Sequence, residues 1–449
     1  MRRLIKLICL VICGAMLAVA AAGCKSGGGD EDDTPETKVV RIWVHKSEAE
    51  DEGKVYSAIA EAFNESEFKT EDGRTIRMRI EFYNDASTLN NAINSVIVTG
   101  GLPDIIAVDA PNVVAYASEG VLTDISGYID DDTLDDYVDS VIEQGTYNGG
   151  LYALSAMDAP TGLYYNKALL KEVGYTDADF GTIERPWSWP EVLAAMTKLK
   201  TAGKAYKIKL NLGFGGEEGC IYLYAPLVYS AGGSFVGTDG RASGAFDSDA
   251  TINGLKMLEP FFDTDANGET WVYDGSNDDA LAQGEVAFEV HGPWSISSIK
   301  RNYAEFIESY DIMPLPVYEA GGVRGTAGAG CGSWCFGVTP NAKDKHAAAK
   351  AVEYFTGAFA SQLLYESIGT FPTHKSLFDS ITDFGSGPAL SMANILTEIA
   401  TPRPKAVNYP KITSAFNDLL SYVQTKYGAS DYNLKNYASE LCVNIDAGI

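Results

Sequence analysis

From residue 39 onward, apolar strands alternate with amphipathic helices, and this alternation constrains the fold more than any other feature of the chain. VVRIWV at 39–44 is an apolar strand, residues 54–67 have helical periodicity, and residues 75–83 alternate as a strand. A helix at 89–100 and a buried strand at 104–109 repeat this order. Strands and helices at this spacing predict a parallel sheet with helices on both faces, so the fold class is α/β.

Polar side chains stand where two of these strands end. His45, Lys46 and Ser47 follow the first strand, and Asp109 closes the strand at 104–109. Ligands of open α/β sheets bind at the carboxyl ends of the strands, so these four residues are candidate ligand contacts. For Asp109 the alternative is a capping role at the helix of residues 112–121, because Asp is a frequent N-cap residue.

The start of the chain has the order of a secretory signal. Arg2, Arg3 and Lys6 precede an apolar run that reaches Ala22, and small residues lead to Cys24. The run is too short for a comfortable membrane span. Its Ala-Ala-Gly-Cys ending resembles a bacterial lipobox, which predicts removal of residues 1–23 and a lipid on Cys24. An ordinary signal peptide cut near the alanines is the alternative.

The segment that follows Cys24 is rich in glycine and acidic residues. KSGGGDEDDTPET at 25–37 cannot bury apolar surface, so we expect residues 24–38 to form a lipidated, flexible acidic tether. The lipid would hold the protein at the outer side of a cell membrane.

Length and charge limit the function of the remaining chain. Removal of residues 1–23 leaves 426 of the 449 residues, which is too long for one ordinary core and predicts two domains. The formal charge of −27 becomes −30 when Arg2, Arg3 and Lys6 are removed. So acidic a chain is not expected to bind nucleic acid or an anionic membrane surface directly.

Five short motifs follow one another in an order that resembles a known family. They are GLPDII at 101–106 with Asp109, LYYNK at 163–167 with WPE at 189–191, QGEVAF at 283–288 with GPW at 292–294, GSW at 332–334 with FGV at 336–338 and a helix at 345–359, and GTFP at 369–372 with PRP at 402–404. Together they are similar to the extracellular solute-binding proteins of ABC sugar importers, the group that includes maltose- and trehalose-binding proteins.

This resemblance implies a two-lobe periplasmic-binding-protein-like fold of type II, with three hinge crossings and a ligand cleft between the lobes. It implies residues 39–153 plus 290–328 as lobe I, and residues 154–289 plus 329–449 as lobe II. The implied function is capture of a di- or oligosaccharide by a monomeric receptor, which delivers it to the transmembrane permease subunits of an ABC importer. A binding protein needs neither catalysis nor a cofactor.

The resemblance also adds candidate ligand contacts near the hinges. Sugars present hydroxyls, which suit carboxylates, amides and guanidinium groups, and an apolar face that packs on aromatic rings. On this logic the candidates are Trp294, Trp334, Asp158, Glu217 and Arg403. Four of them have a structural alternative: packing for the two tryptophans, a solvated loop for Glu217, and a clamp that holds a lobe for Arg403.

A calcium loop is a further candidate. Asp263, Asp265, Asn267 and Asp274 follow the spacing of calcium ligands, with Gly268 at the turn. The twelfth position holds Asp rather than the bidentate Glu, and such turns are common on acidic surfaces. The sparse cysteines of the mature chain (Cys220, Cys331, Cys335 and Cys442) predict buried thiols or at most one disulfide.

Two other functions compete with sugar capture. One is a receptor for a non-sugar solute such as a glycerophosphodiester, because a fold does not fix its ligand. The other is a surface glycosidase, which needs two carboxylates at a fixed separation. Nothing in the sequence marks such a pair, and no nucleophile elbow or glycine-rich phosphate loop follows a strand.

Overall fold

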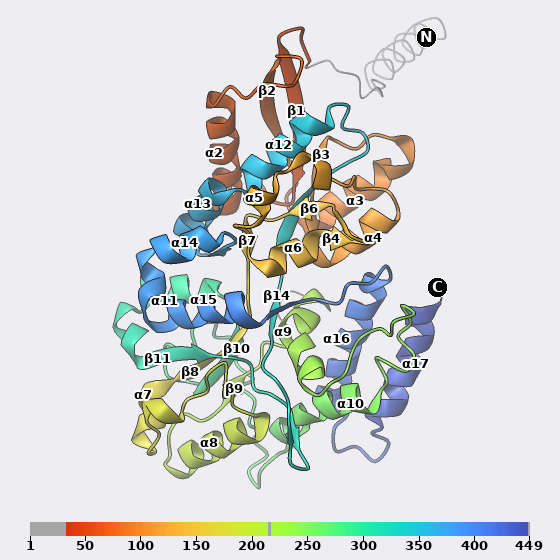
Figure 1. Ribbon diagram of the computed structural model, residues 1–449. Coiled ribbons are helices and arrows are strands. Elements are labelled where there is room, and N and C mark those ends of the chain that lie inside the picture. Colours follow the sequence, from red (N-terminus) through yellow and green to blue (C-terminus); the bar gives the residue numbers. More distant parts are fainter. Residues whose placement is uncertain (1–32, 214–216, 448–449) are drawn as a thin grey trace, which may run out of the picture.

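A computed structural model describes residues 33–213 and 217–447, which form two lobes joined at a narrow waist (Figure 1). Cys24 and most of the predicted tether lie outside the described residues. The first strand begins at Thr37, and the Asp33 carboxylate accepts hydrogen bonds from Lys38 Nζ and from the backbone N–H of Val39. The prediction of a flexible tether through residue 38 was therefore wrong for its last residues, because they are bound to lobe I.

Lobe I contains a five-stranded sheet in the order β2-β1-β3-β15-β6. Its strands are β1 (Thr37–Val44), β2 (Thr75–Phe82), β3 (Ile105–Asp109), β6 (Ala153–Leu154) and β15 (Trp334–Val338), beside the small hairpin of β4 (Thr146–Tyr147) and β5 (Gly150–Leu151). Its helices are α2 (Asp51–Glu65), α3 (Ala86–Val96), α4 (Val113–Ser118), α5 (Asp131–Leu134), α6 (Asp139–Gly145), α12 (Lys345–Thr356) and α13 (Ala358–Ile368), with α14 (Lys375–Ser380) packed against α13. Strands β1, β2 and β3 are parallel, as the alternation predicts.

Lobe II contains a four-stranded sheet in the order β11-β8-β10-β9. Its strands are β8 (Gly162–Asn166), β9 (Ile208–Lys209), β10 (Phe288–His291) and β11 (Tyr310–Met313), and a separate hairpin joins β12 (Glu319–Ala320) to β13 (Val323–Arg324). Its helices are α7 (Lys167–Glu172), α8 (Trp189–Thr201), α9 (Glu217–Ser230), α10 (Asp249–Leu255), α11 (Trp294–Asn302), α15 (Gly387–Ile399), α16 (Tyr409–Lys426) and α17 (Leu434–Asp446). The start of α8 has a capping box between Ser188 and Glu191.

The predicted lobe boundaries were wrong for two segments. Residues 290–328 were expected in lobe I, but β10 and β11 pair antiparallel with β8 and so complete the sheet of lobe II. Residues 329–449 were expected in lobe II, but β15 pairs antiparallel with β3 and brings α12 and α13 into lobe I. An apolar strand pattern shows that a segment is buried in a sheet, and it does not show which of two sheets the segment joins.

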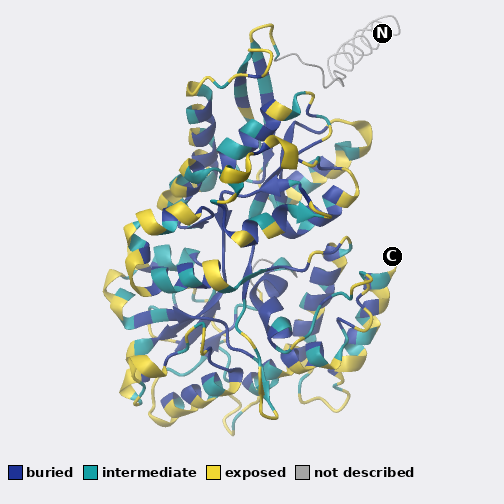
Figure 2. Ribbon diagram, in the orientation of Figure 1, coloured by how far each residue is buried: buried dark blue, intermediate teal, exposed yellow. Residues whose placement is uncertain are grey.

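Within the described residues the chain passes between the lobes three times, which confirms the expected hinge arrangement. The first crossing carries β7 (Met157–Asp158), which pairs with β16 (Phe371–Pro372) of the third crossing. The second carries β14 (Ala329–Cys331), which pairs with β17 (Ala400–Pro402). These short strands are almost wholly buried, as the dark waist in Figure 2 shows. The hinge is therefore a set of paired, desolvated segments rather than loose linkers.

Each lobe has its own apolar core. Ile42, Ile59 and Phe336 belong to the core of lobe I, and Leu163 and Phe416 belong to that of lobe II. Cys220, Cys331, Cys335 and Cys442 are buried free thiols. In the described part of the chain, no helix has both the length and the apolar character needed to span a membrane.

Candidate functional site

A hollow of about 280 Å³ lies at the waist, where the two lobes and the crossings meet. Its lining includes residues from lobe I (His45, Lys46, Glu52, Asp109 and Trp334), from lobe II (Glu218, Tyr222 and Trp294), from the crossings (Met157, Ala159, Gly332 and Thr370), and Arg403, which follows β17 at the waist. We call it the interlobe hollow. The structure brings six of the nine predicted ligand contacts together in this lining: His45, Lys46, Asp109, Trp294, Trp334 and Arg403.

Lobe I contributes an indole ring that rests on a histidine. Trp334 is the first residue of β15 and lies opposite Asp109 of β3 in the sheet register. Its ring stacks on the His45 imidazole, with centroids 3.6 Å apart and planes inclined by 10°. The stack fixes the orientation of an indole that remains partly exposed to the hollow.

The His45 imidazole is held in place by Glu52 of α2. Its Nε2 lies 3.3 Å from Oε1 of Glu52, which accepts a hydrogen bond of 2.6 Å from the hydroxyl of Tyr56. Burial lowers the pKa of His45, against the raising effect of Glu52, so the imidazole is neutral near pH 7. A neutral, buried imidazole is suited to support the Trp334 ring without adding charge to the hollow.

Lobe II contributes a second indole from the start of α11. Trp294 follows Gly292 and Pro293, and its ring folds back over Gly292 so closely that a Cβ there would lie 2.3 Å from ring carbons. The ring is inclined by 23° to that of Tyr222, at a centroid distance of 6.2 Å. The Tyr164 hydroxyl donates a 2.6 Å hydrogen bond to the carbonyl of Gly292. Only glycine at 292 permits this placement of the indole.

Arg403 joins the lobes across the hollow. Its Nη2 donates to Oδ1 of Asp109 at 2.6 Å and its Nη1 donates to Oδ2 at 3.1 Å, a two-pronged contact with lobe I. Nη1 also donates to Glu218 of lobe II, and the hydroxyl of Tyr409 donates to the same carboxylate. The Arg403 side chain is only 5% exposed. The structure thus gives it the clamping role, at a position that still lines the hollow.

Gly332 makes room for this guanidinium. Its φ of 144° lies outside the range that L side chains readily adopt, and a Cβ there would lie 2.7 Å from Nη2 of Arg403. The first residue of the GSW motif therefore creates the space for the Arg403 guanidinium that connects the lobes.

The prediction of Asp158 as a ligand contact was wrong. Its side chain is fully buried, and its oxygens accept hydrogen bonds from Ser140 Oγ, Gln144 Nε2 and the backbone N–H groups of Ala159 and Gly332, at 2.7 to 3.1 Å. Burial raises the pKa of this carboxyl, while the four donors oppose the shift. Asp158 therefore ties the first crossing to the second and presents no oxygen to a ligand.

Three other predicted residues have different outcomes. Lys46 lines the hollow with its ammonium 3.5 Å from Glu52. Ser47 does not line the hollow; its carbonyl accepts from the N–H of Glu50 at the start of α2.

Glu217 begins α9, and its side chain lies outside what the structure describes. The adjacent Glu218 forms the contact with Arg403, and burial raises the pKa of its carboxyl, against the lowering effect of Arg403.

Sequence reasoning missed Glu52 and Tyr222. Tyr222 stands four residues after Glu218 on α9, so one helical turn places both toward the hollow, and that spacing was the available signal. Glu52 looks like an ordinary acidic residue in the first turn of a helix, and nothing local distinguishes it from its neighbours.

The calcium prediction finds no support. Oδ1 of Asp265 accepts from the N–H groups of Asn267 and Glu269, and Oδ2 accepts from Lys200 at 2.8 Å. The Lys200 ammonium lowers the pKa of Asp265 to about 2. Asp274 lies apart from this turn, in the lining of another hollow. No group of three or more potential metal ligands occurs among the residues that the structure describes.

The chain matches known proteins over most of its length. It is 24% identical over 334 residues to the maltodextrin-binding protein MdxE of Bacillus subtilis, which covers 72% of each chain. It is also 24% identical over 370 residues to a maltotriose-binding protein of Pyrococcus abyssi, which covers 80% of this chain and 74% of that protein. Among solved structures, the cyclic alpha-maltosyl-1,6-maltose binding protein from Arthrobacter globiformis superimposes with a TM-score of 0.72 at 20% identity, over 91% of this chain and 99% of that one.

These similarities agree with the two-lobe fold that the motifs implied. The sequence profile described as bacterial extracellular solute-binding protein matches residues 47–360, which is more than half of the chain and includes the first four of the five motifs. The function of such proteins is to bind a solute for transport and not to catalyse a reaction. The chain therefore belongs to the bacterial extracellular solute-binding proteins.

Proposed function

We propose that this protein captures a carbohydrate in the interlobe hollow and delivers it to the permease of an ABC importer. The observation that carries the proposal is the placement of two indoles in one hollow, Trp334 from lobe I and Trp294 from lobe II, beside the charged group of Arg403, Asp109 and Glu218. Aromatic rings provide faces for the apolar side of a pyranose, and the charged groups provide strong donors and acceptors for its hydroxyls.

The relatives support this ligand class. The proteins from Bacillus subtilis and Pyrococcus abyssi are described as binding maltodextrin and maltotriose. The superimposed Arthrobacter globiformis protein is described as binding a cyclic maltosyl saccharide. Malto-oligosaccharides are therefore the first ligands to test.

The charge of the hollow separates this proposal from its competitors. The lining carries the carboxylates of Glu52, Asp109 and Glu218 against the cations Lys46 and Arg403. Each carboxylate already contacts one of these cations, so neither cation among the described lining residues lacks a countercharge and is left for a phosphate or a uronic acid. The same pairing argues against a glycosidase, because Asp109 and Glu218 share Arg403 and neither is placed as an unpaired acid or base.

Capture and delivery follow from the two-lobe arrangement. A sugar that contacts groups of both lobes binds the closed form more tightly than the open form, and so favours closure. The closed receptor then docks on the transmembrane permease subunits. We further infer that the protein acts as a monomer at the outer face of the cell membrane, held by the lipid on Cys24, which raises its effective concentration near the permease.

Isothermal titration calorimetry with maltose, maltotriose and maltotetraose tests the proposal. We expect at least one of them to bind with a stoichiometry of one, and Trp334→Ala to weaken that binding. A panel of malto-, isomalto- and cello-oligosaccharides that gives no heat and no thermal shift would overturn the sugar assignment. Binding of sn-glycerol 3-phosphate in place of the sugars would support the non-sugar receptor instead.

A further inference from the structure

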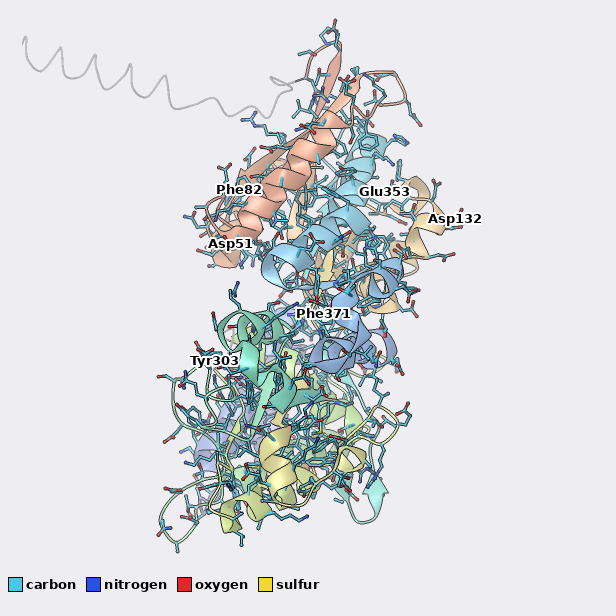
Figure 3. All side chains as sticks on the ribbon, turned by 90° about the vertical axis from the view of Figure 1, so that its left-hand side faces the viewer. Asp51, Phe82, Asp132, Tyr303, Glu353 and Phe371 are labelled. Carbon is cyan, nitrogen blue, oxygen red and sulfur yellow. The ribbon has the colours of Figure 1, made fainter. Side chains whose placement is uncertain are left out.

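The start of α2 in lobe I and the end of α11 in lobe II face each other. Figure 3 shows Asp51, the first residue of α2, and Tyr303, which follows α11, at the facing edges of the two lobes, with Phe371 at the waist between them. Both helices also reach the interlobe hollow, since Glu52 of α2 and Trp294 of α11 line it. The two helix ends therefore border the hollow from opposite sides.

The lobe I edge is acidic. We call residues 46–54 the lobe I rim. Its charged side chains are the carboxylates of Glu48, Glu50, Asp51 and Glu52 and the ammonium groups of Lys46 and Lys54, which leaves a net charge of −2. The ammonium of Lys54 lies 2.8 Å from Asp51, and that of Lys46 lies 3.8 Å from Glu50. Two cations do not neutralise four carboxylates, so the rim presents a negative field at the edge of the lobe.

The lobe II edge carries an exposed arginine. Arg301 lies seven residues after Trp294 on α11, which is about two helical turns or about 10 Å along the axis, so both residues project from the same face. The adjacent Lys300 is turned away by about 100° and donates to Asp383 at 2.6 Å. Arg301 itself forms no ion pair and no side-chain hydrogen bond with any residue that the structure describes.

The charge of Arg301 nevertheless acts on lobe I. The hydrogen bond and the charge of Lys54 lower the pKa of the Asp51 carboxyl, and the positive charge of Arg301 lowers it further. Arg403 is already bound to carboxylates of both lobes, whereas Arg301 attracts the opposite lobe without contacting it. Coulomb attraction grows as the distance between charges falls, so the attraction between these edges is strongest when the lobes are closest.

We infer that the lobe I rim and Arg301 form an electrostatic latch, which engages when the lobes close around a ligand and stabilises the closed state. This inference rests on the proposed function, because the bound sugar brings the lobes together. A contact that favours the closed form raises the apparent affinity without touching the ligand. The affinity for an uncharged sugar should therefore fall as salt is added, since salt screens the charges of the exposed rims.

Calorimetry with maltotetraose at about 20 mM and about 500 mM NaCl tests the latch. We expect the affinity of the wild type to be about two- to fivefold lower at high salt, the range of exposed ion pairs. Arg301→Glu places a carboxylate opposite the acidic rim. It should bind about fivefold more weakly than the wild type at low salt and within about twofold of it at high salt.

A charge exchange separates the latch from a general effect of charge. Asp51→Lys/Arg301→Glu restores a pair of opposite sign and should recover much of the affinity that Arg301→Glu loses. Arg185→Glu is the matched control, because it makes the same substitution at an exposed position before α8, which lies away from the waist in Figure 1. It should leave the affinity and its salt dependence unchanged. Thermal unfolding verifies that each variant folds, and Arg301→Gln, which should reduce the salt dependence, suffices if the exchanged pair does not.

Cross-linking tests the approach of the rims without relying on charge. In Asp51→Cys/Arg301→Cys a short bismaleimide should join the two thiols, and saturating maltotetraose should increase the cross-linked fraction severalfold. Mass spectrometry of the intact protein measures this fraction. The two single-cysteine variants are the controls, since Cys220, Cys331, Cys335 and Cys442 are buried.

The possible failures are distinguishable. An affinity that does not depend on salt, or an Arg301→Glu protein that binds like Arg185→Glu, would overturn the latch while sugar capture stands. Sugar binding that leaves the cross-linked fraction unchanged would overturn it too, because the rims would not meet on closure. If no sugar of any length binds, the proposed function fails; a cross-link formed without sugar would then retain the latch for the ligand-free protein, and its absence would overturn both.

Discussion

The two hollows differ in which lobes build them. The interlobe hollow takes Trp334 and Asp109 from lobe I, and Trp294 and Glu218 from lobe II, and Arg403 connects both sides. A second hollow, of about 1170 Å³, lies between α11 and α16 and is lined by residues of lobe II alone; we call it the lobe II hollow. A contact that exists only when the lobes meet favours closure, whereas a contact made equally in the open and closed states changes affinity without moving that equilibrium. The interlobe hollow should therefore drive closure, and the lobe II hollow should add affinity and length selectivity.

Removal of Arg403 should have the largest effect on both the stability of the protein and its affinity for sugars. Arg403→Ala leaves Asp109 and Glu218 near each other without their shared cation, and breaking a buried ion pair typically lowers the free energy of unfolding by about 3–5 kcal/mol. Truncating a buried charge partner at a binding site also costs roughly 100-fold in affinity, which we expect for sugars of every length. Chemical denaturation and calorimetry measure the two effects.

Lys405→Ala is the control for this variant, because Lys405 lies on the same segment and its ammonium donates to the carbonyl of Glu143 at the surface. It should change neither stability nor affinity appreciably. An Arg403→Ala protein with wild-type affinity would show that the clamp is unrelated to the ligand site.

Loss of the lobe I indole should have the second-largest effect on sugar affinity. Trp334→Ala removes the ring that stacks on His45 and should weaken short and long sugars alike by roughly 10- to 100-fold, the range of a central aromatic anchor. Trp334→Phe retains an aromatic face and should recover part of this loss. Calorimetry with maltose and maltotetraose provides the measurement; a loss confined to maltotetraose would place the indole outside the shared part of the site.

Displacement of the lobe II indole should have a smaller effect that depends on ligand length. In Gly292→Ala the new Cβ would lie 2.3 Å from the Trp294 ring, so the ring must move. We expect about a tenfold loss, or about 1.4 kcal/mol, for maltotetraose, which passes Trp294 into the lobe II hollow, and a smaller loss for maltose. Gly127→Ala, at a site with open space around its Cα, is the control. A larger loss for maltose would contradict the expectation that the longer sugar depends more on the Trp294 ring.

Acidification should affect stability much more than affinity. Burial lowers the pKa of His291 to about 4, below the unfolded value of 6.5, so the unfolded state binds more protons than the folded state between these pH values. Stability is therefore complete above pH 6.5 and is lost as the pH falls toward 4, by about 2–3 kcal/mol from this group. Sugar affinity should change less than twofold between pH 7.5 and 6.5.

Thermal unfolding at several pH values tests this prediction with His291→Gln, which should make the decline below pH 6.5 shallower. Burial also lowers the pKa values of His45 and His374, so these two histidines should account for a part of the decline that remains. His346→Gln, the same substitution at an exposed position, provides the matched control. An identical decline in His291→Gln would assign the acid sensitivity to other groups.

The ends of strands and the hinge motifs could be predicted from the sequence. His45 and Asp109 follow apolar strands, and Trp334 and Arg403 stand in short motifs with small or rigid neighbours, so local patterns pointed to all four. Asp158 was a candidate because it lies at the first crossing, but its carboxylate faces inward, toward Ser140 and Gln144 of α6 and the backbone N–H of Gly332. Such contacts depend on tertiary structure and leave no local signal.

Long-range pairing explains the other differences. The lobe II hollow depends on β9 reaching β10 and on α16 lying beside both, and these elements are separated by about 80 to 210 residues in sequence. The wrong lobe assignment of β10, β11 and β15 has the same cause, because an antiparallel strand can pair with a strand that is distant in the sequence. The choice between Glu217 and Glu218 depends on the rotation of α9, which two adjacent carboxylates do not reveal.

The most direct test of the account follows closure and binding in one titration. Small-angle X-ray scattering of the wild type with increasing maltotetraose should show the radius of gyration falling in step with the saturation measured by calorimetry. Asn417→Ala/Ser421→Ala should compact equally at saturation, since it alters only the lobe II hollow, whereas Trp334→Ala should compact less. Saturated binding with an unchanged scattering curve would contradict the claim that the sugar is held between the two lobes.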